Sequence, residues 1–289
     1  MKLQGPILVG VDFSAASDQA LRQGIDLANG LGTNLIVCHV VPGLDTVNIL
    51  FPQFADRNAE HRQTLIDKAL AAVERQIATR LGDAPSNVRA VIGSGTPHAG
   101  LLAQADATSA GLIVLGPGRT ADRVVRHATV PVLIGRHSSR GIVVGATDFS
   151  DPSLPALEVA ASEARRRGSQ LQLLHVVDVG VFALAGTAGG GLPFLPAAPS
   201  TLLPPIDDLV SAAEGRLRDA LTRFAIDGEA IVKSGPAAQT IVDLAASAPA
   251  ELVVVGTHGR TGLSRLTLGS TAELVIRSAT CSVLVVRLT

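Results

Sequence analysis

The residues with the clearest chemical potential lie near the carboxyl end of the chain, where glycines recur beside small hydroxyl side chains. An apolar run is followed by GTHGRTGLSRLTLGST, residues 256–271, and then by a helical pattern. Glycine lets a ligand approach the backbone closely, and the free N–H groups at a helix start favour phosphate. The segment therefore predicts an anion site, to which Arg260 and Arg265 could add charge-assisted contacts.

Two common nucleotide loops do not match this segment. A P-loop requires GxxxxGK[ST], and no lysine occurs from Gly256 to Thr289. A dinucleotide-binding GxGxxG belongs in the first strand-to-helix turn, where the second half of the chain has Asp148-Phe-Ser150 instead. Alternatively, the glycines only shape a tight strand-to-helix connection, and the spacing by itself leaves that possibility open.

The chain repeats itself, and the repeat defines the elements that must position this segment. The runs ILVGVDFS from Ile7 and IVVGATDFS from Ile142 match each other, as do LIVCHVV from Leu35 and LQLLHVV from Leu171. The period is near 140 residues, which is too long for a solenoid and indicates two duplicated domains. We expect these domains at 1–138 and 139–289.

Each half alternates short apolar runs with amphipathic stretches. Runs such as Leu252–Val255 and Val283–Val286 are apolar throughout, as in strands buried on both faces of a parallel sheet. The expected order in each half is β-α-β-long helix-β-α-β-α-β. This order predicts an α/β fold of two tandem Rossmann-like domains, each an open parallel five-stranded sheet with helices on both faces.

In such a sheet, ligands bind beyond the carboxyl ends of the strands, where the winding direction reverses. In the second half, Thr147 and Asp148 follow the first strand, and Gly256 opens the connection after the fourth. His175 lies near the end of the second strand. We therefore expect the anion site at this edge of the second sheet.

Both halves resemble the universal stress protein family, whose members carry an early (V/T)DFS, a second strand that ends in HV, and G-x2-G-x9-G-(S/T). In this chain Gly256, Gly259, Gly269 and Ser270 satisfy the last pattern. The resemblance covers nearly the whole chain twice. It implies a regulatory stress-response protein whose second domain binds ATP, with Mg²⁺ accompanying the phosphates.

The resemblance also implies the residues that would bind the nucleotide. Asp148 and Val176 would border the adenine and ribose, and Gly256, His258 and Gly259 would line the ribose and first phosphates. Gly269, Ser270 and Thr271 would grip the terminal phosphates. The complete expected set is Thr147, Asp148, Val176, Val255, Gly256, His258, Gly259, Arg260, Gly269, Ser270 and Thr271.

The first half departs from the pattern. Asp12, Val40 and Gly116 are present, but Pro117 follows, and pairing Gly118-Arg-Thr with Gly259-Arg-Thr leaves a gap of about ten residues before the last strand. On that pairing the gap removes the Gly-Ser phosphate half of the motif. We expect a degenerate domain that does not bind ATP and serves as a pseudo-partner in a built-in dimer.

Other chemistry-bearing residues have structural interpretations. We expect His39 and His175 to be hydrogen-bonded at strand ends rather than catalytic, and Cys38 and Cys281 to be reduced core thiols. The cluster of arginines at 165–167 predicts a solvated helix end rather than a nucleic-acid patch. We expect neither catalytic residues nor a metal site formed by protein ligands, because no cluster has zinc spacing.

Composition bounds the remaining function classes. The chain has 289 residues, 24 Lys and Arg against 25 Asp and Glu, no Trp and no Tyr. Near-neutral charge and few aromatic residues argue against nucleic acid as a partner. We expect a cytoplasmic protein with no signal peptide, and a homodimer is possible.

The stretch from Val179 to Ile206 has no charged residue, but its glycines and prolines are incompatible with a membrane-spanning helix. We interpret it as a loop, either a lid or docking surface near the nucleotide or a passive linker. Two further functions remain open for the whole chain. One is a nucleotide-dependent enzyme, such as a slow ATPase or an adenylyl transferase, and the other is a nucleotide-free scaffold.

Overall fold

The computed structural model describes residues 5–43, 55–82, 86–137, 141–177, 205–257 and 268–287. Apart from single residues at the chain ends, the chain divides into two compact units. One unit comprises residues 2–137 together with 282–287, and the other comprises residues 138–281. We refer to these as the first and second units.

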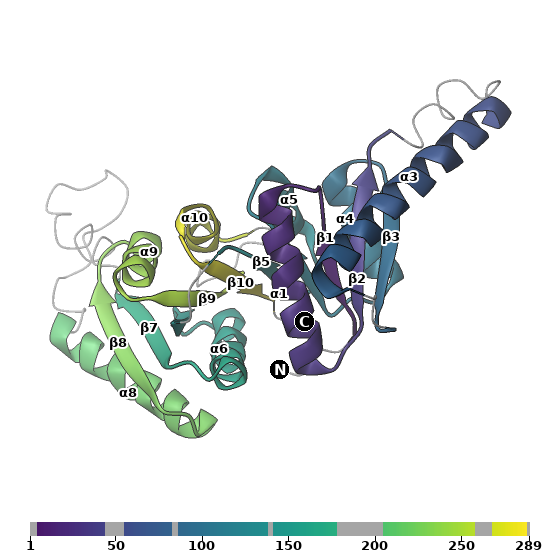
Figure 1. Cartoon of the computed structure of the whole chain (residues 1–289). Coiled ribbons are helices and arrows are strands. Elements are labelled where there is room, and N and C mark those ends of the chain that lie inside the picture. The colour runs from purple at the N-terminus through teal and green to yellow at the C-terminus, as the bar shows by residue number, and fades with distance from the viewer. Residues whose placement is uncertain are drawn as a thin grey trace, which may run out of the picture. The chain divides into compact units, whose positions relative to one another are not determined.

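Strands and helices alternate along both units (Figure 1). The elements of the first unit are β1 (Ile7–Gly10), α1 (Ala15–Leu31), β2 (Leu35–Val41), α3 (Ala55–Leu81), β3 (Val88–Ser94), α4 (Pro97–Ala107), β4 (Leu112–Leu115), α5 (Arg119–His127), β5 (Val132–Ile134) and β10 (Ser282–Val286). Those of the second unit are β6 (Ile142–Thr147), the short 3₁₀ helix η2 (Asp151–Ser153), α6 (Leu154–Arg167), β7 (Leu171–Val177), α8 (Ile206–Phe224), β8 (Gly228–Ser234), α9 (Ala237–Ser247), β9 (Ala250–Gly256) and α10 (Ser270–Ser278).

The sheets are predominantly parallel. In the first unit the strand order is β3-β2-β1-β4-β5, all parallel, and β10 pairs with β5 in the antiparallel direction. In the second unit the order is β9-β6-β7-β8, again parallel. In the first unit, β2 and β3 therefore follow on one side of β1, and β4 and β5 lie on its other side. In the second unit, β7 and β8 likewise lie on one side of β6, and β9 lies on the other. The α/β Rossmann-like fold predicted from the repeat is confirmed. The expectation of five parallel strands in each domain is wrong, because β10 belongs to the first unit, where it pairs with β5 in the antiparallel direction, and the described part of the second unit has four strands.

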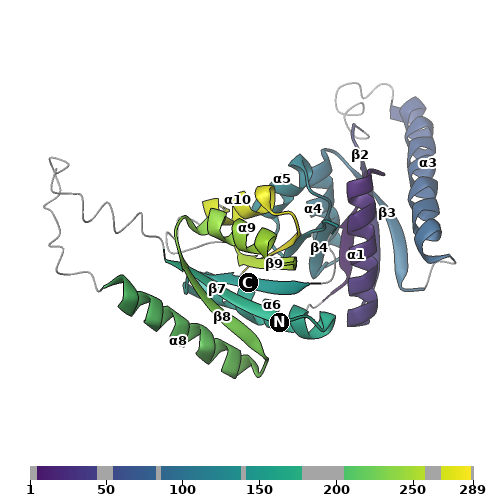
Figure 2. The same ribbon diagram turned by 60° about the vertical axis from the view of Figure 1, so that its left-hand side comes forward.

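The central strands are buried on both faces, as their uninterrupted apolar runs predict. All residues of β1, β4, β5 and β6 are buried, as are those of β9 except Gly256. In the second unit α6 and α8 cover one face, while α9 and α10 cover the other (Figure 2). In a sheet covered in this way, ligands bind beyond the carboxyl ends of the strands.

Helix α6 ends as its sequence predicts, but its arginines behave differently. Gly168 terminates the helix in the left-handed conformation, with φ of 64°. Arg166 and Arg167 both pair with Glu163, and Arg167 also reaches Glu251 on β9 at 3.2 Å. The expectation of a solvated helix end is wrong for these two arginines, because two buried carboxylates hold them against the sheet.

Strand β10 is fastened to the first unit by polar side chains as well as by its pairing with β5. The hydroxyl of Ser282, a buried residue, accepts hydrogen bonds from Gln23 Nε2 at 2.9 Å and from the Arg136 backbone N–H at 3.1 Å. The guanidinium of Arg287 donates to the backbone oxygens of Val125 and Arg126. These contacts fasten the last strand of the second repeat to the first unit.

Two further expectations from the sequence can be compared with the fold. Cys38 and Cys281 are buried and neither takes part in a disulfide, as predicted for reduced core thiols. Of the helices in the described ranges, none has the length and apolarity that crossing a bilayer would need. The lid hypothesis concerns a segment whose residues 179–204 lie outside the described residues.

Candidate functional site

The candidate site of the second unit lies where the winding of the sheet reverses, between the carboxyl ends of β6 and β9. Thr147 ends β6 and is directly followed by Asp148, while Gly256 ends β9. The two strands pair in parallel, so both ends meet at the same edge. The topology therefore brings together residues more than 100 positions apart in the sequence.

Asp148 is held by a tight turn at the start of the β6–α6 connection. Its Oδ1 accepts hydrogen bonds from the Ser150 backbone N–H at 3.0 Å and from the Ser150 hydroxyl at 2.5 Å. Phe149 between them has φ of 61°, an uncommon conformation for a residue with a side chain. The turn fixes one carboxylate oxygen of Asp148 at the strand edge.

Thr147 supports this turn from below. Its hydroxyl accepts the Phe149 N–H at 2.9 Å and lies 2.8 Å from the hydroxyl of Ser153, and its backbone oxygen accepts a hydrogen bond from His175 Nδ1 at 2.8 Å. That contact assigns the proton to Nδ1 of the imidazole. The hydrogen-bonded position predicted for His175 at a strand end is confirmed. Thr147 is 7% exposed, and its hydroxyl supports the turn that carries Asp148.

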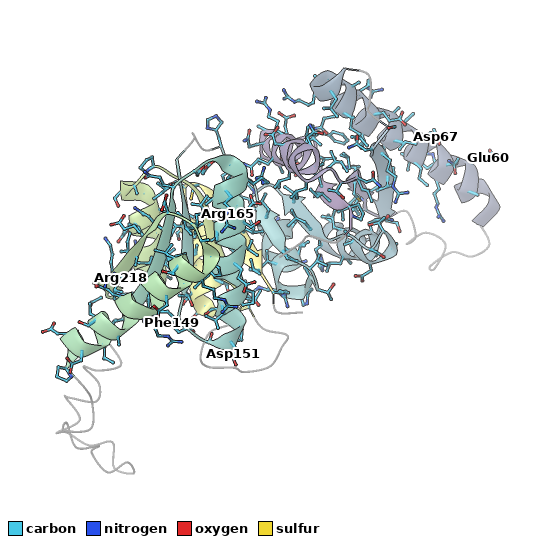
Figure 3. All side chains as sticks on the ribbon, turned by 90° about the horizontal axis from the view of Figure 1, so that it is seen from below. Glu60, Asp67, Phe149, Asp151, Arg165 and Arg218 are labelled. Atoms are coloured by element: carbon cyan, nitrogen blue, oxygen red, sulfur yellow. The ribbon has the colours of Figure 1, made fainter. Side chains whose placement is uncertain are left out.

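A stack of three side chains joins helix α8 to the same turn. The Phe149 ring stacks on His175 with centroids 4.4 Å apart, and Arg216 of α8 lies over the Phe149 ring at 4.0 Å. Phe149 is visible beside α8 in Figure 3, where Arg218 of that helix is also labelled. Sequence reasoning missed Phe149 and Arg216. The Asp-Phe-Ser sequence, present in both halves, is the signal that could have identified Phe149.

The expected phosphate end of the site is the amino end of α10. Gly269 is its N-cap residue, and among the described residues no side chain caps the helix. The Gly269 N–H donates to the Thr257 backbone oxygen at 2.8 Å, which ties the start of α10 to the end of β9. Ser270 is exposed and Thr271 is half-buried. The first N–H groups of α10 therefore remain available to an anion near the strand ends.

The remaining predicted residues fall into two groups. Val176 is half-buried near the end of β7, and Val255 is buried in β9 at 4% exposure. A Cβ at Gly256 would lie 3.0 Å from the Pro152 backbone oxygen, so this glycine accommodates the protein's own η2 turn. His258, Gly259 and Arg260 lie outside the described residues.

The first unit repeats the carboxylate turn. Asp12 Oδ1 accepts from the Ser14 N–H at 3.0 Å and from the Ser14 hydroxyl at 2.5 Å, and Phe13 has φ of 64°. His39 Nδ1 donates to the Val11 backbone oxygen at 2.8 Å. Burial raises the pKa of Asp12, but hydrogen bonds from Ser14 and Ser17 outweigh it and hold that pKa below its usual value. Asp12 is therefore ionised at neutral pH.

The gap in the first repeat lies elsewhere than its sequence suggests. Gly118 is the N-cap of α5, as Gly269 is of α10, so Gly118-Arg119-Thr120 corresponds to Gly269-Ser270-Thr271. The offset between the repeats is 140 residues at Gly116 and Gly256 but 151 residues at the two N-caps, Gly118 and Gly269. The connection between strand and helix is therefore eleven residues shorter in the first repeat than in the second. The expectation that the gap removes the helix start is wrong, because only the loop before it is missing.

A comparison with known protein families agrees with this duplicated geometry. The family model described as the universal stress protein family matches residues 5–136 and again residues 140–287. The chain belongs to the universal stress protein family. The resemblance that the repeated motifs indicated is thus confirmed for both halves.

Universal stress proteins of similar length exist in mycobacteria. One from Mycobacterium tuberculosis is 30% identical over 305 residues, covering 97% of this chain and 96% of its own. Another, from Mycolicibacterium smegmatis, is 28% identical over 308 residues, with 97% and 96% covered. The crystal structure of a universal stress protein from Archaeoglobus fulgidus superimposes with a TM-score of 0.64 at 19% identity, covering 98% of this chain and 96% of that one. This last likeness supports the fold alone.

Metal-binding groups were also sought among the residues that have described positions. Within those ranges, no three or more His, Cys, Asp or Glu side chains come together in a way that could hold an ion. In the second unit, Asp148 is the carboxylate at the strand edge, and its Oδ1 is already engaged by Ser150. A Mg²⁺ ion that arrived with a nucleotide would be coordinated mainly by phosphate oxygens and water.

Proposed function

We propose that the chain is a nucleotide-responsive regulatory protein, and that its second domain, residues 139–289, binds ATP. The observation that carries this proposal is the helix start at Gly269 and Ser270, which no side chain of the described residues caps, beside the strand edge that carries Asp148. Phosphate is the ligand that such a helix start favours, and the carboxylate suits a ribose hydroxyl or an exocyclic amine.

The expected residues divide the nucleotide between them. The half-buried Val176 supplies apolar surface for the purine, the buried Val255 lies beneath it, and Asp148 accepts hydrogen bonds from the ribose end. Gly269, Ser270 and Thr271 donate to the terminal phosphates. His258, Gly259 and Arg260 complete the site in the connection between β9 and α10, as the family pattern implies. Mg²⁺ accompanies the phosphates and needs few protein ligands.

The role is regulatory rather than enzymatic in this proposal. Efficient phosphoryl transfer requires a positioned cation, metal-binding carboxylates and a base aimed at the attacking group. At the described strand edge of the second unit, Asp148 is fixed by Ser150 and His175 by Thr147, so both side chains serve the turn. Buried free cysteines at positions 38 and 281 fit a reducing cytoplasm.

Isothermal titration of the full chain with ATP tests the proposal. One ATP per chain is expected, and Gly269→Val with Ser270→Val should lower the affinity at least tenfold by placing bulk where phosphate must approach. Ser278→Val, at the exposed opposite end of α10, is the matched control and should leave the affinity unchanged. If the wild-type protein does not bind ATP, the proposal is refuted and the nucleotide-free scaffold remains. If the protein hydrolyses ATP in the same sample, the nucleotide-dependent enzyme is favoured.

A further inference from the structure

One face of helix α5 in the first unit carries a row of basic side chains. Arg119, Arg123 and His127 recur at every fourth position, and side chains with this spacing lie on the same side of a helix. All three are exposed. From the first to the last of them the helix rises about 12 Å. The row therefore runs along the whole length of α5.

Helix α4 adds a fourth basic side chain beside this row. The two helices pack against each other (Figures 1 and 2). His98, in the first turn of α4, is half-buried, and its Nδ1 lies 3.3 Å from the Thr96 hydroxyl oxygen. Burial lowers the pKa of His98, and the positive charges of Arg123 and His127 lower it further. We call His98, Arg119, Arg123 and His127 together the basic surface.

The stability of the fold does not account for the basic surface. Like charges four residues apart destabilise a helix, and α5 contains a single acidic residue, Asp122. The helix dipole favours a cation in the last turn, which accounts for His127. The same dipole disfavours Arg119 in the first turn and does not explain Arg123 in the middle.

The second repeat shows that the shared architecture forms without these charges. Helices α9 and α10 pack together as α4 and α5 do. With Gly95 matched to Gly235 and Gly118 matched to Gly269, the four equivalent positions are neutral: Ala238, Ser270, Leu274 and Ser278. The basic surface is therefore a property of the first unit alone, and binding of an anionic partner is the role that its chemistry suits.

An apolar side chain within the basic surface narrows the choice of partner. Leu102 follows His98 by four residues on the same face of α4 and is half-buried. Neither α4 nor α5 contains a Phe, Tyr or Trp on which a nucleic-acid base could stack. A peptide that carries both carboxylates and aliphatic side chains matches the cations and Leu102 together.

We propose that the basic surface binds an acidic segment of a partner protein, with aliphatic side chains among its carboxylates. The carboxylates pair with Arg123, His127 and His98, and an aliphatic side chain packs on Leu102. The length of the row matches about two turns of an acidic helix. This interaction does not depend on ATP binding by the second domain, so either proposal can fail without the other.

Titration of the full chain with a fluorescent peptide of repeated Glu-Glu-Leu units tests the proposal. Arg123→Leu with His127→Ser should weaken binding at least fivefold. Both changes install the residues that the second repeat carries at these positions, Leu274 and Ser278, so the helix should remain folded. The matched control is Arg75→Leu with His61→Ser at exposed positions of α3, which should leave the affinity unchanged. Circular dichroism checks that both double variants are folded.

Three results would overturn the proposal. The first is absence of peptide binding by the wild-type chain, and the second is an equal loss of affinity in the two double variants. The third is equal binding of a Gln-Gln-Leu peptide, because that probe keeps the aliphatic groups without the charges. Tighter binding of a single-stranded oligonucleotide of the same charge would likewise refute a protein partner. Added salt should weaken binding of the Glu-Glu-Leu peptide, since the cations are exposed.

Discussion

At the scale of single residues, the two units build the same turn from Asp, Phe and Ser but surround it differently. Asp12 and Phe13 are exposed, whereas Asp148 and Phe149 are half-buried. Phe149 has Arg216 over its ring, and Phe13, 46% exposed, contacts His39 at a centroid distance of 4.7 Å. A duplicated motif has therefore acquired two environments, and only the motif itself is evident from sequence.

The ion pairs around Glu163 lead to the first stability prediction. Burial raises the pKa of Glu163, but Arg166 and Arg167 outweigh it and hold the pKa below its usual value of 4.5. Glu163→Gln leaves Arg166 without its counter-charge and Arg167 with Glu251 alone, so we expect a loss of about 3 kcal/mol in the free energy of unfolding at pH 7. Urea denaturation measures this loss. The control is Glu214→Gln, which removes a half-buried carboxylate from an ion pair with the exposed Arg218 and should cost about 0.5 kcal/mol or less.

The same pair determines how that difference varies with pH. Because the folded pKa is lower than the unfolded one, the ionised carboxylate contributes fully above about 4.5 and loses its contribution as the pH falls through the folded value. The gap between wild type and Glu163→Gln should therefore be constant from pH 6 to 8 and narrow below pH 4.5. A gap that widened on acidification would show that the arginines do not hold Glu163 ionised.

At the scale of elements, the sequence predicts the strands well because burial on both faces leaves a direct trace in composition. Runs such as Leu252–Val255 are apolar throughout, and the structure places them inside a parallel sheet. The partner of β10 could not be predicted in this way. The apolar residues of β10 would suit pairing with any buried strand, so they do not specify its partner. The contacts that fasten β10 beside β5 involve the polar side chains of Gln23 and Ser282 and the backbone of Arg136, and none of these produces a periodic pattern in the sequence.

The residues of the candidate site could also be predicted only in part. Asp148, Gly256 and Gly269 follow from motif spacing and from the strand ends that the repeat defines. The correspondence of Gly118 with Gly269 did not follow, since Gly-Arg-Thr occurs at both Gly118 and Gly259 and letter matching favours the wrong pair. The structure resolves the ambiguity, because Gly118 and Gly269 are both N-cap residues of the helix that follows the fourth strand of their repeat. Matching the sequence letters alone does not show which residue begins a helix.

Helix α8 provides a prediction at this scale, since one of its side chains connects it to the Asp148 turn. Arg216→Ala removes the cation over Phe149, and at an exposed position this should cost about 0.5–1 kcal/mol of unfolding free energy. Arg218→Ala removes an equal charge from the same helix without touching that ring, and chemical denaturation compares the two. NMR should show shifted His175 ring signals in Arg216→Ala but not in Arg218→Ala. Equal shifts in both variants would contradict the prediction, because they would show that the positive charge of α8, and not the contact of Arg216 with Phe149, affects His175.

At the scale of the whole molecule, the chain combines two sheets of one ancestry whose strand edges have diverged. Connections after β4 and β9 differ in length by eleven residues between equivalent glycines, while the carboxylate turns at their other side keep the same hydrogen bonds. Divergence between the two strand edges is thus concentrated in this connection. Both units begin the following helix at a glycine N-cap, so the length of the connection before that helix is what distinguishes them there.

Hydrogen exchange across the whole chain tests whether the different lengths of the two connections give the two units different affinities for ATP. Backbone N–H groups at the start of a helix have no intrahelical acceptor, so they exchange rapidly unless a ligand accepts from them. We expect ATP to slow exchange in peptides covering 269–272 and to leave those covering 118–121 unchanged at concentrations that saturate one site. Peptides from β3 and β8, on the far sides of the sheets, serve as internal references. Equal protection of both helix starts by ATP would contradict this expectation, because a three-phosphate ligand would then fit both connections despite their different lengths.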